Sequence, residues 1–354
     1  MRELLIIKTA ALGDVLRTTS ILPGLRGRFP GVRVTWATAS GAVDLVRNHP
    51  AVAEVVGFDP KSPASLAETR ARLAGRSWDW VISLDDEESL CELASSLTAK
   101  KLSGAHLEPR GSERRRVYTP DVAPWFDMGL LSVHGKARAD ELKVENRRSH
   151  PEILAGMLGI EMGKPQLPLG EPVLAAAAEF ARGSALFQGG IVVGLNTGAG
   201  GRWHSKTLSP ERTVNLAEAL SRSLGGRVTF LLFGGLDERA RNTQIVERAA
   251  GRVRLVDAGC DNALLDFAAR LSLCKLLITS DSLALHVALA RNVRVVAFFA
   301  PTSAAEIETY GLGTKVASTA PDYCSYRADA DTSSLTTERL LAAALGELRQ
   351  VQPA

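Results

Sequence analysis

Short apolar runs alternate with longer amphipathic stretches through the first hundred residues. The runs are rich in β-branched and aromatic residues, a pattern that predicts strands. We expect strands at residues 4–7, 32–37, 52–58, 78–84 and 101–104, and helices at 15–29 (interrupted by Pro23 and Gly24), 42–48, 65–73 and 87–99. Strands that alternate with helices predict a parallel, doubly wound α/β sheet.

The same alternation starts again at Gly190. It predicts strands at 191–196, 228–233, 253–257, 276–279 and 293–299, with helices at 211–224, from 238, at 263–273, at 283–290 and at 335–348. The two series predict two α/β domains, residues 1–165 and 173–334, joined by a prolyl segment within 160–172. A C-terminal helical segment, 335–354, follows, and packing on the first domain is one option for it. Two such domains predict a binding cleft between them.

Residues 108–148 differ from the rest of the first half because they lack a regular apolar repeat and are rich in Arg and Lys. The arginine fork suits phosphate and carboxylate groups, since it donates two hydrogen bonds at once. We therefore expect an irregular insert that binds an anionic acceptor through Arg114, Arg115 and Arg116, together with Arg17 of the first helix. The alternative is a charge run that forms a solvated face.

Composition narrows the class of protein. The 354 residues are 45% hydrophobic with a formal net charge of +3, which indicates a globular chain and does not call for nucleic acid. Four scattered cysteines without a C-x-x-C pair predict reduced thiols rather than zinc or disulfides. The N-terminal run is too short for a signal peptide, and no apolar stretch is long enough to span a membrane. We expect a cytoplasmic protein, with peripheral contact at the inner membrane face left open, and a monomer or small homo-oligomer.

Asp14 is the first candidate for chemistry. It follows the opening strand, Lys8 and a loop of small residues, and ligands bind beyond the carboxyl ends of strands in open α/β sheets. The alternative is a helix N-cap. A second acidic run, residues 85–88, offers carboxylates for a divalent metal or for the first turn of a helix. We favour the helix start, because no second carboxylate cluster would complete a coordination sphere.

Three loops of the second half carry further candidates. The Gly-rich loop that starts at Thr197 and Gly198 fits neither a P-loop nor a dinucleotide fingerprint, but its backbone can approach an anion. Lys206 is a point charge suited to phosphate. The turn at residues 280–282 begins a helix and offers N–H groups to an anion, or is capped by its own side chains. Two further residues have two readings each: Glu238 binds ribose or opens a helix, and His286 binds the ligand or packs in the core.

Four segments in order give the chain a specific resemblance. They are residues 8–15 (KTAALGDV), 206–212 (KTLSPER), 281–286 (DSLALH) and 299–303 (FAPTS). They resemble the K-x-x-x-x-G-D-V, K-x-W-x-x-E-R, D-[ST]-G-x-x-H and F-G-P-T-[SD] motifs of bacterial glycosyltransferase family 9, the heptosyltransferases. Leu208, Leu283 and Ala300 depart from these motifs. The resemblance implies the GT-B fold, with two Rossmann-like domains facing a central cleft.

The resemblance also implies an inverting sugar transfer. Asp14 would be the general base that deprotonates an acceptor hydroxyl. Lys206 and the N–H groups of Ser282 and Leu283 would stabilise the leaving diphosphate without a metal or other cofactor. Asp281 would hold sugar hydroxyls and Glu238 the ribose. The further donor-binding residues would be Thr197, Gly198 and His286, with the adenine against residues 259–262.

The implied donor is ADP-heptose, and the acceptor would be lipopolysaccharide core or a related glycan, glycolipid or natural product. Because Leu283 replaces a glycine, its side chain is expected to crowd the sugar diphosphate. Two other functions stay open. One is a nucleotide-sugar epimerase of the same architecture, and the other is a nucleotide-sugar-binding protein without catalysis. An epimerase would act without an acceptor, and a binding protein would bind nucleotide without turnover.

Overall fold

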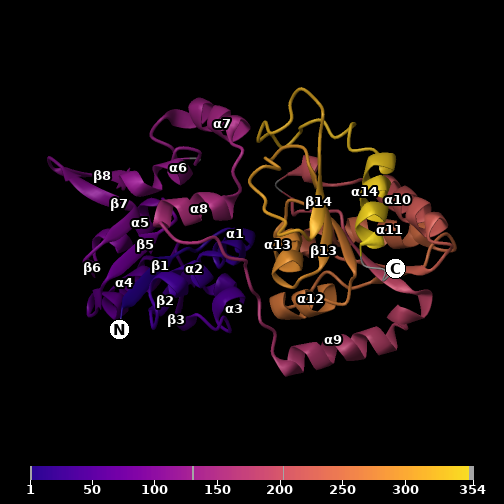
Figure 1. The fold of residues 1–354 in the computed structure, drawn as a ribbon, viewed down its shortest axis with the longest axis horizontal. Coiled ribbons are helices and arrows are strands. Elements are labelled where there is room, and N and C mark those ends of the chain that lie inside the picture. The colour runs from indigo at the N-terminus through magenta and orange to yellow at the C-terminus, as the bar shows by residue number, and fades with distance from the viewer. Residues whose placement is uncertain (1, 130, 202, 351–354) are drawn as a thin grey trace. The chain divides into compact units, whose positions relative to one another are not determined.

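The computed structural model describes residues 2–129, 131–201 and 203–350 (Figure 1). The chain forms two compact units that meet between Pro168 and Leu169, inside the expected prolyl segment. Each unit holds one six-stranded sheet with helices around it. The α/β class and the two doubly wound sheets predicted from the sequence are confirmed.

The sheet of the first unit has the order β3-β2-β1-β5-β7-β8. All neighbouring strands are parallel except β7 and β8, which form an antiparallel hairpin. The strands are β1 (Glu3–Ile7), β2 (Arg33–Ala39), β3 (Val52–Phe58), β5 (Trp80–Ser83), β7 (Leu102–Arg110) and β8 (Glu113–Tyr118), and β4 (Ser77–Trp78) pairs separately with β6 (Thr98–Ala99). Because β1 lies between β2 and β5, the chain changes direction across the sheet there.

The helices of the first unit cover both faces of this sheet. They are α1 (Leu12–Thr18), α2 (Ile21–Arg28), α3 (Val43–Val46), α4 (Pro63–Ala74), α5 (Glu88–Ser95), α6 (Ala123–Phe126), α7 (Gly135–Glu145) and α8 (His150–Leu158), with 3₁₀ turns η1 (Ser40–Ala42) and η2 (Pro120–Val122). On one face, Leu5 and Ile7 of β1 and Val81 of β5 pack with Leu90 and Leu93 of α5. Burial of these apolar side chains fixes β1 as the centre of the unit.

The sheet of the second unit repeats the arrangement, in the order β11-β10-β9-β12-β13-β14, and all its neighbouring strands are parallel. The strands are β9 (Ile191–Asn196), β10 (Val228–Leu232), β11 (Leu255–Asp257), β12 (Leu276–Ser280), β13 (Arg294–Phe299) and β14 (Gly313–Ala317). The helices are α9 (Glu171–Gly183), α10 (Pro210–Ser223), α11 (Arg239–Ala249), α12 (Leu264–Leu271), α13 (Leu283–Ala290) and α14 (Thr337–Arg349), with η3 (Leu186–Gly189), η4 (His204–Lys206) and η5 (Leu236–Glu238).

The C-terminal helix α14 packs within the second unit. Its residues Leu340, Ala344 and Leu348 join the core formed by the second sheet and α10. Packing of residues 335–354 on the first domain stays a prediction.

The first long helix is interrupted at a different place from the one expected. The break lies at Thr19 and Ser20, and Pro23 and Gly24 are inside α2. Pro23 is the third residue of α2, where a backbone N–H has no partner within the helix, so proline is tolerated. A Cβ on Gly24 would lie 2.2 Å from the carbonyl oxygen of Glu161, so glycine here permits close packing.

The sequence predicts an irregular insert at 108–148, and the structure shows that this prediction is wrong. It contains the end of β7, strand β8 and helices α6 and α7, and the β7–β8 hairpin extends from the sheet edge (Figure 1). The hairpin was missed because residues 108–115 are exposed and so show no apolar alternation. Helix α9 and the short edge strand β14 were missed as well. The helix expected at 87–99 ends at Ser95, before β6.

None of the four cysteines, all of which lie within the described residues, forms a disulfide. In the described part of the chain, no helix combines the length and the apolar character needed to cross a bilayer.

Candidate functional site

The candidate residues of the first unit lie where the order of its sheet reverses. β1 pairs with β2 on one side and with β5 on the other. Lys8 directly follows β1, and Asp85 follows β5 by two residues. Ligands of open α/β sheets bind at such a switch point, beyond the carboxyl ends of the strands.

Lys8 and Asp85 form a buried ion pair across this switch point. The Lys8 ammonium also donates to the Ala10 carbonyl at 2.5 Å. The second oxygen of Asp85 accepts the Thr9 backbone N–H at 2.5 Å and the Thr9 hydroxyl at 2.9 Å. One carboxylate therefore holds the start of the loop that leads to Asp14.

This pair corrects part of the interpretation of the acidic run. α5 begins at Glu88, after Glu87 at its N-cap position, as expected for a helix start. Asp85 does not serve the helix, because both of its oxygens bond to Lys8 and Thr9. The sequence showed a signal for this contact, since charged residues of opposite sign follow two strands that are neighbours in a doubly wound sheet.

The pKa of Lys8 reflects two opposing effects. Burial disfavours the charged ammonium, but the Asp85 carboxylate and the nearby Asp14 carboxylate favour it, and the balance raises the pKa of Lys8 above its ordinary value. Lys8 is therefore a fixed positive charge at neutral pH, within electrostatic reach of Asp14.

Asp14 is the third residue of α1, and the N-cap position belongs to Ala11. The N-cap reading of Asp14 is therefore wrong in position, although its carboxylate reaches back to the Ala11 N–H at 3.4 Å. Arg17 pairs with the other carboxylate oxygen at 2.8 Å, and 34% of the Asp14 side chain is exposed. The Arg17 guanidinium lies 5.7 Å from the centre of the Trp125 ring. Asp14 is thus an accessible carboxylate at the positive end of a helix.

The three expected acceptor arginines lie on β8. They differ in how close their contacts bring them to the switch point of the first unit. Arg114 and Arg115 pair with β7 toward the tip of the hairpin, and all three line a groove of about 330 Å³. Arg116 alone reaches back to the carboxyl end of β5, where it donates to the Asp86 carbonyl at 3.3 Å. Arg116 is therefore the member of this group that is closest to the switch point by its contacts.

The second unit has a corresponding switch point between β9 and β12. Lys206, from η4, donates to the carboxylate of Asp281 at 2.8 Å and to its carbonyl at 2.9 Å. Both side chains are largely buried. The structure thus brings together two of the predicted site residues, which are 75 positions apart in the chain.

The start of α13 is arranged differently from a simple cap. Ser282 occupies the N-cap position, but its hydroxyl makes no capping bond. It lies instead 3.3 Å from the side-chain amide of Asn196 and 3.1 Å from the Thr279 hydroxyl. The capping alternative is therefore wrong for this side chain, and the N–H groups of Leu283 and Ala284 begin a helix whose positive end suits an anion.

Glu238 connects two glycine-containing loops. One carboxylate oxygen accepts the Gly200 N–H at 2.7 Å and the other accepts the Gly235 N–H at 2.8 Å. A Cβ on Gly198 would lie 2.5 Å from the Glu238 Cγ, so glycine is needed for this approach. The geometry shows the helix-opening role of Glu238, and the ribose role stays a prediction.

Thr197 is fully buried, and its contacts are internal to the protein. Its hydroxyl lies 3.1 Å from that of Thr213, and its carbonyl accepts Arg241 at 2.8 Å. Arg241 also donates to the Leu208 carbonyl at 2.7 Å, and burial lowers its pKa despite the Glu238 charge. Sequence reasoning missed Arg241, because an arginine within a polar helix is typical of a solvated face.

His286 is buried one turn into α13, with Nε2 3.9 Å from the Asp281 carboxylate. Its ring is therefore near the carboxylate to which Lys206 donates. Across the described residues, no group of three or more His, Cys, Asp and Glu side chains is arranged to hold a metal ion.

The chain was compared with models of known protein families. The model of glycosyltransferase family 9 (heptosyltransferase) matches residues 134–334, more than half of the chain. The chain belongs to glycosyltransferase family 9. The resemblance inferred from the four motifs is confirmed, and the protein is a glycosyltransferase.

Solved structures share the fold of this family 9 protein. A family 9 glycosyl transferase from Veillonella parvula has 22% identity and a TM-score of 0.77, with 99% of this chain and 98% of that chain covered. ADP-heptose lps heptosyltransferase II of E. coli has 15% identity and a TM-score of 0.66, with both chains fully covered. E. coli heptosyltransferase WaaC with ADP has 17% identity and a TM-score of 0.56, covering 99% and 96%. No curated protein matches this family 9 chain.

Proposed function

We propose that this protein transfers a sugar, heptose from ADP-heptose, to an acceptor hydroxyl with inversion at the anomeric carbon. The observation that carries the proposal is the second switch point. There, Lys206 and Asp281 lie beside the uncapped start of α13, an arrangement that suits a sugar diphosphate. Both E. coli heptosyltransferase structures named above align with nearly the whole of this chain. One is named for ADP-heptose and the other holds ADP, which supports ADP-heptose as the donor proposed here.

Asp14 acts in this proposal as the general base. Its carboxylate takes the proton from the acceptor hydroxyl as the oxygen attacks the anomeric carbon, and the bond to the diphosphate breaks on the opposite side. General-base catalysis of this kind contributes about 10²–10⁴-fold. Partial exposure of Asp14 supports the role, since an acceptor must reach it.

Residues that bind the donor in this proposal also stabilise the negative charge that develops on the leaving diphosphate. Lys206 and the N–H groups of Ser282 and Leu283 stabilise the departing ADP by fixed positive charge and dipoles, a role that a metal is not needed to fill. Asp281 turns from Lys206 to the sugar hydroxyls, and Glu238 holds the ribose. Asp14 and Lys206 belong to different units, so in this proposal both units contribute residues to the reaction.

The acceptor in this proposal is an anionic glycan or glycolipid, such as lipopolysaccharide core, or an anionic natural product. Arg17 and Arg116 lie nearest the switch point of the first unit and would bind its charges, with Arg114 and Arg115 farther along the hairpin. These contacts define an acceptor class only, because an arginine fork binds phosphate and carboxylate alike.

Mass spectrometry of nucleotide sugars captured by the purified protein tests the donor. ADP-heptose should be retained and should yield transferred product with the opposite anomeric configuration by NMR. Retention of uridine or guanosine sugars alone would show that the ADP-heptose assignment is wrong. Incubation of the nucleotide sugar without any acceptor distinguishes a transferase from an epimerase. A transferase leaves the sugar unchanged under that condition, whereas an epimerase converts it.

A further inference from the structure

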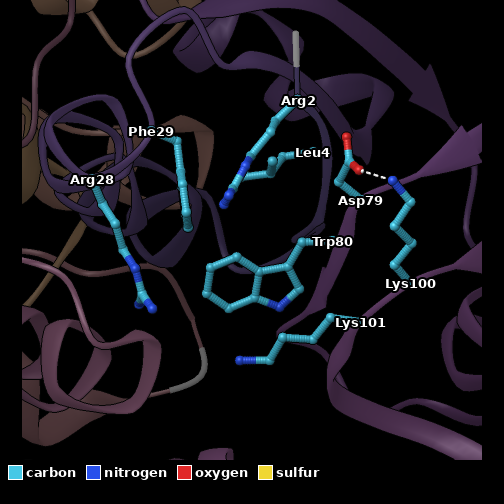
Figure 2. Close-up of a pocket in the computed structure, with 8 residues that line it drawn as sticks. All are labelled: Arg2, Leu4, Arg28, Phe29, Asp79, Trp80, Lys100 and Lys101. Carbon is cyan, nitrogen blue, oxygen red and sulfur yellow. Dashed lines mark hydrogen bonds and ion pairs between the residues drawn. The ribbon is translucent and has the colours of Figure 1, made fainter.

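The amino edge of the first sheet carries a basic hollow that sugar transfer does not use. It has a volume of about 560 Å³ and lies where β1 and β5 begin. Figure 2 shows the side chains that line it. Its lining residues are Arg2, Leu4, Arg28, Phe29, Asp79, Trp80, Lys100 and Lys101. From Leu4 to Lys8, β1 spans roughly 13 Å, so the hollow is at the opposite end of the strand from the switch point.

Two aromatic rings form a rigid base for this hollow. Phe29 and Trp80 meet edge to face, with ring centres 6.2 Å apart. Trp80 is buried, and its indole N–H donates to the Ser103 hydroxyl at 3.0 Å. The rings are thus fixed by packing and hydrogen bonding before any ligand binds.

Neutral groups hold the cations of the hollow in place. The Arg2 guanidinium lies 4.2 Å from the centre of the Phe29 ring, and the Lys101 ammonium lies 4.2 Å from that of Trp80. Arg28 donates to the carbonyls at the end of α8, at 2.6 Å and 2.8 Å. Ring faces and carbonyls orient a cation but do not cancel its charge.

Carboxylates compensate these cations only in part. Asp79 is the one carboxylate among the lining residues, and it accepts the Lys100 ammonium at 2.7 Å, to one side of the hollow in Figure 2. Lys101 also lies 3.2 Å from Asp121, which does not line the hollow. The four lining cations, Arg2, Arg28, Lys100 and Lys101, thus outnumber these two carboxylates, and the concave surface keeps excess positive charge.

We propose that this hollow binds the phosphate group of a small phosphorylated ligand, either a phosphomonoester or a diphosphate. Arginine forks and an ammonium in one concave surface match several phosphate oxygens at once. Arg2 and Lys101 each lie over one of the rings, and Trp80 is 5% exposed, which disfavours stacking of a nucleotide base on Trp80. The volume falls in the range of small-molecule sites and leaves room for the remainder of the ligand.

NMR of the full-length protein labelled with ¹⁵N-tryptophan, titrated with inorganic pyrophosphate, tests this proposal. The Trp80 indole signal, assigned with Trp80→Phe, should shift and saturate at physiological salt. The Trp203 signal serves as a separate reporter, because Lys206 lies 5.7 Å from that ring at the proposed donor site. Binding at the two sites, and failure of either proposal, can therefore be distinguished in one experiment.

Matched variants separate a built site from general attraction to a basic protein. Arg2→Gln with Lys101→Gln should weaken the response at Trp80 at least tenfold, and Lys101→Gln alone serves if the double variant does not fold. Lys61→Gln removes the same charge from an exposed loop of the same unit and should change the affinity less than twofold. An equal effect of the control and the double variant would overturn the proposal.

Vesicles of phosphatidylcholine with phosphatidic acid distinguish a lipid headgroup from a free ligand. Sedimentation with these vesicles that is lost in the double variant identifies a lipid-borne phosphomonoester. A response to pyrophosphate without vesicle binding identifies a soluble phosphorylated ligand. A Trp80 signal that moves with neither probe means that the hollow is not a phosphate site.

Discussion

At the residue scale, Asp14 is the proposed general base, and its hydrogen bond and ion pair within α1 are weak contacts. Its pair with Arg17 is partly exposed and its bond to Ala11 is long, and such surface contacts contribute little free energy. We predict that Asp14→Ala lowers the rate of transfer by about 10²–10⁴-fold while the melting temperature stays within a few degrees of wild type. Steady-state kinetics and calorimetry check this, and full activity of the variant would remove Asp14 from the mechanism.

Asp85 is the opposite case, a carboxylate whose role is structural. It is buried against Lys8, and removal of one partner leaves a buried charge unpaired, at a cost of about 3–5 kcal/mol. We therefore predict that Asp85→Asn lowers the free energy of unfolding by that amount, measured with urea at pH 7.

The neighbouring residue supplies the control for that variant. Burial and the Glu87 charge raise the pKa of Asp86, an effect that Arg116 offsets only in part. At a pH above the ordinary pKa of Asp86, its ionised form is therefore less favoured in the folded state than in the unfolded state. Asp86→Asn should leave stability at pH 7 unchanged or higher, and a loss equal to that of Asp85→Asn would contradict this account.

His49 predicts how stability depends on pH. Burial, helped by the Arg26 charge, lowers the pKa of His49 from 6.5 to about 4. Between pH 6.5 and 4, His49 binds a proton in the unfolded state but stays neutral in the folded state. The contribution of neutral His49 to the free energy of unfolding is therefore present above pH 6.5 and is lost as the pH falls toward 4. His49→Gln should flatten the loss of unfolding free energy between pH 7 and 5, and His204→Gln, at an exposed site, should not.

At the element scale, the Gly-rich loop depends on its contact with η5. A Cβ on Gly198 would meet the Glu238 side chain at 2.5–3.0 Å, whereas one on Gly201 would have its nearest neighbour at 3.9 Å. We predict that Gly198→Ala displaces Glu238 from the Gly200 N–H and weakens ADP binding several-fold, and that Gly201→Ala does not. Isothermal titration with ADP measures both, and equal affinities would exclude a donor role for this contact.

Strands that bury an apolar run were predictable to within one or two residues at each end, as for β10 and β12. The predicted bounds of β9 and α13, both runs of mostly buried apolar residues, are those of the structure. The predicted bounds of β3 are also those of the structure, although most of its residues are only partly buried or exposed. The β7–β8 hairpin was not predictable in this way, since exposed strands have no buried face to mark them. Helix α9 was hidden by the proline at its second position, which a helix start tolerates.

Among the site residues, those within motifs were predictable from the sequence, whereas their contacts were not. Lys206 and Asp281 could be predicted from motifs, but their mutual ion pair depends on a loop path that no local pattern encodes. The Lys8–Asp85 pair and the Arg241 contacts to Thr197 and Leu208 depend on which strands and loops are neighbours. Pairings across a sheet therefore need the topology, even where each residue is conspicuous alone.

At the scale of the whole molecule, each unit has its own core and its own switch point. The contacts described for Lys206 and Asp281 lie within the second unit, and those of Asp14 lie within the first. Donor binding and proton removal should therefore be separable by mutation, because these contacts of Lys206 and of Asp14 each lie within a single unit.

We accordingly predict that only one of two variants, Lys206→Ala and Asp14→Ala, changes the affinity for ADP. Lys206→Ala should weaken binding about 10-fold or more, because it removes the ammonium proposed to bind the diphosphate and leaves the Asp281 carboxylate without that charge partner. Asp14→Ala should change the ADP dissociation constant less than twofold while transfer is lost. Isothermal titration of both variants measures this, and a common loss of ADP binding would show that the two units bind the donor together.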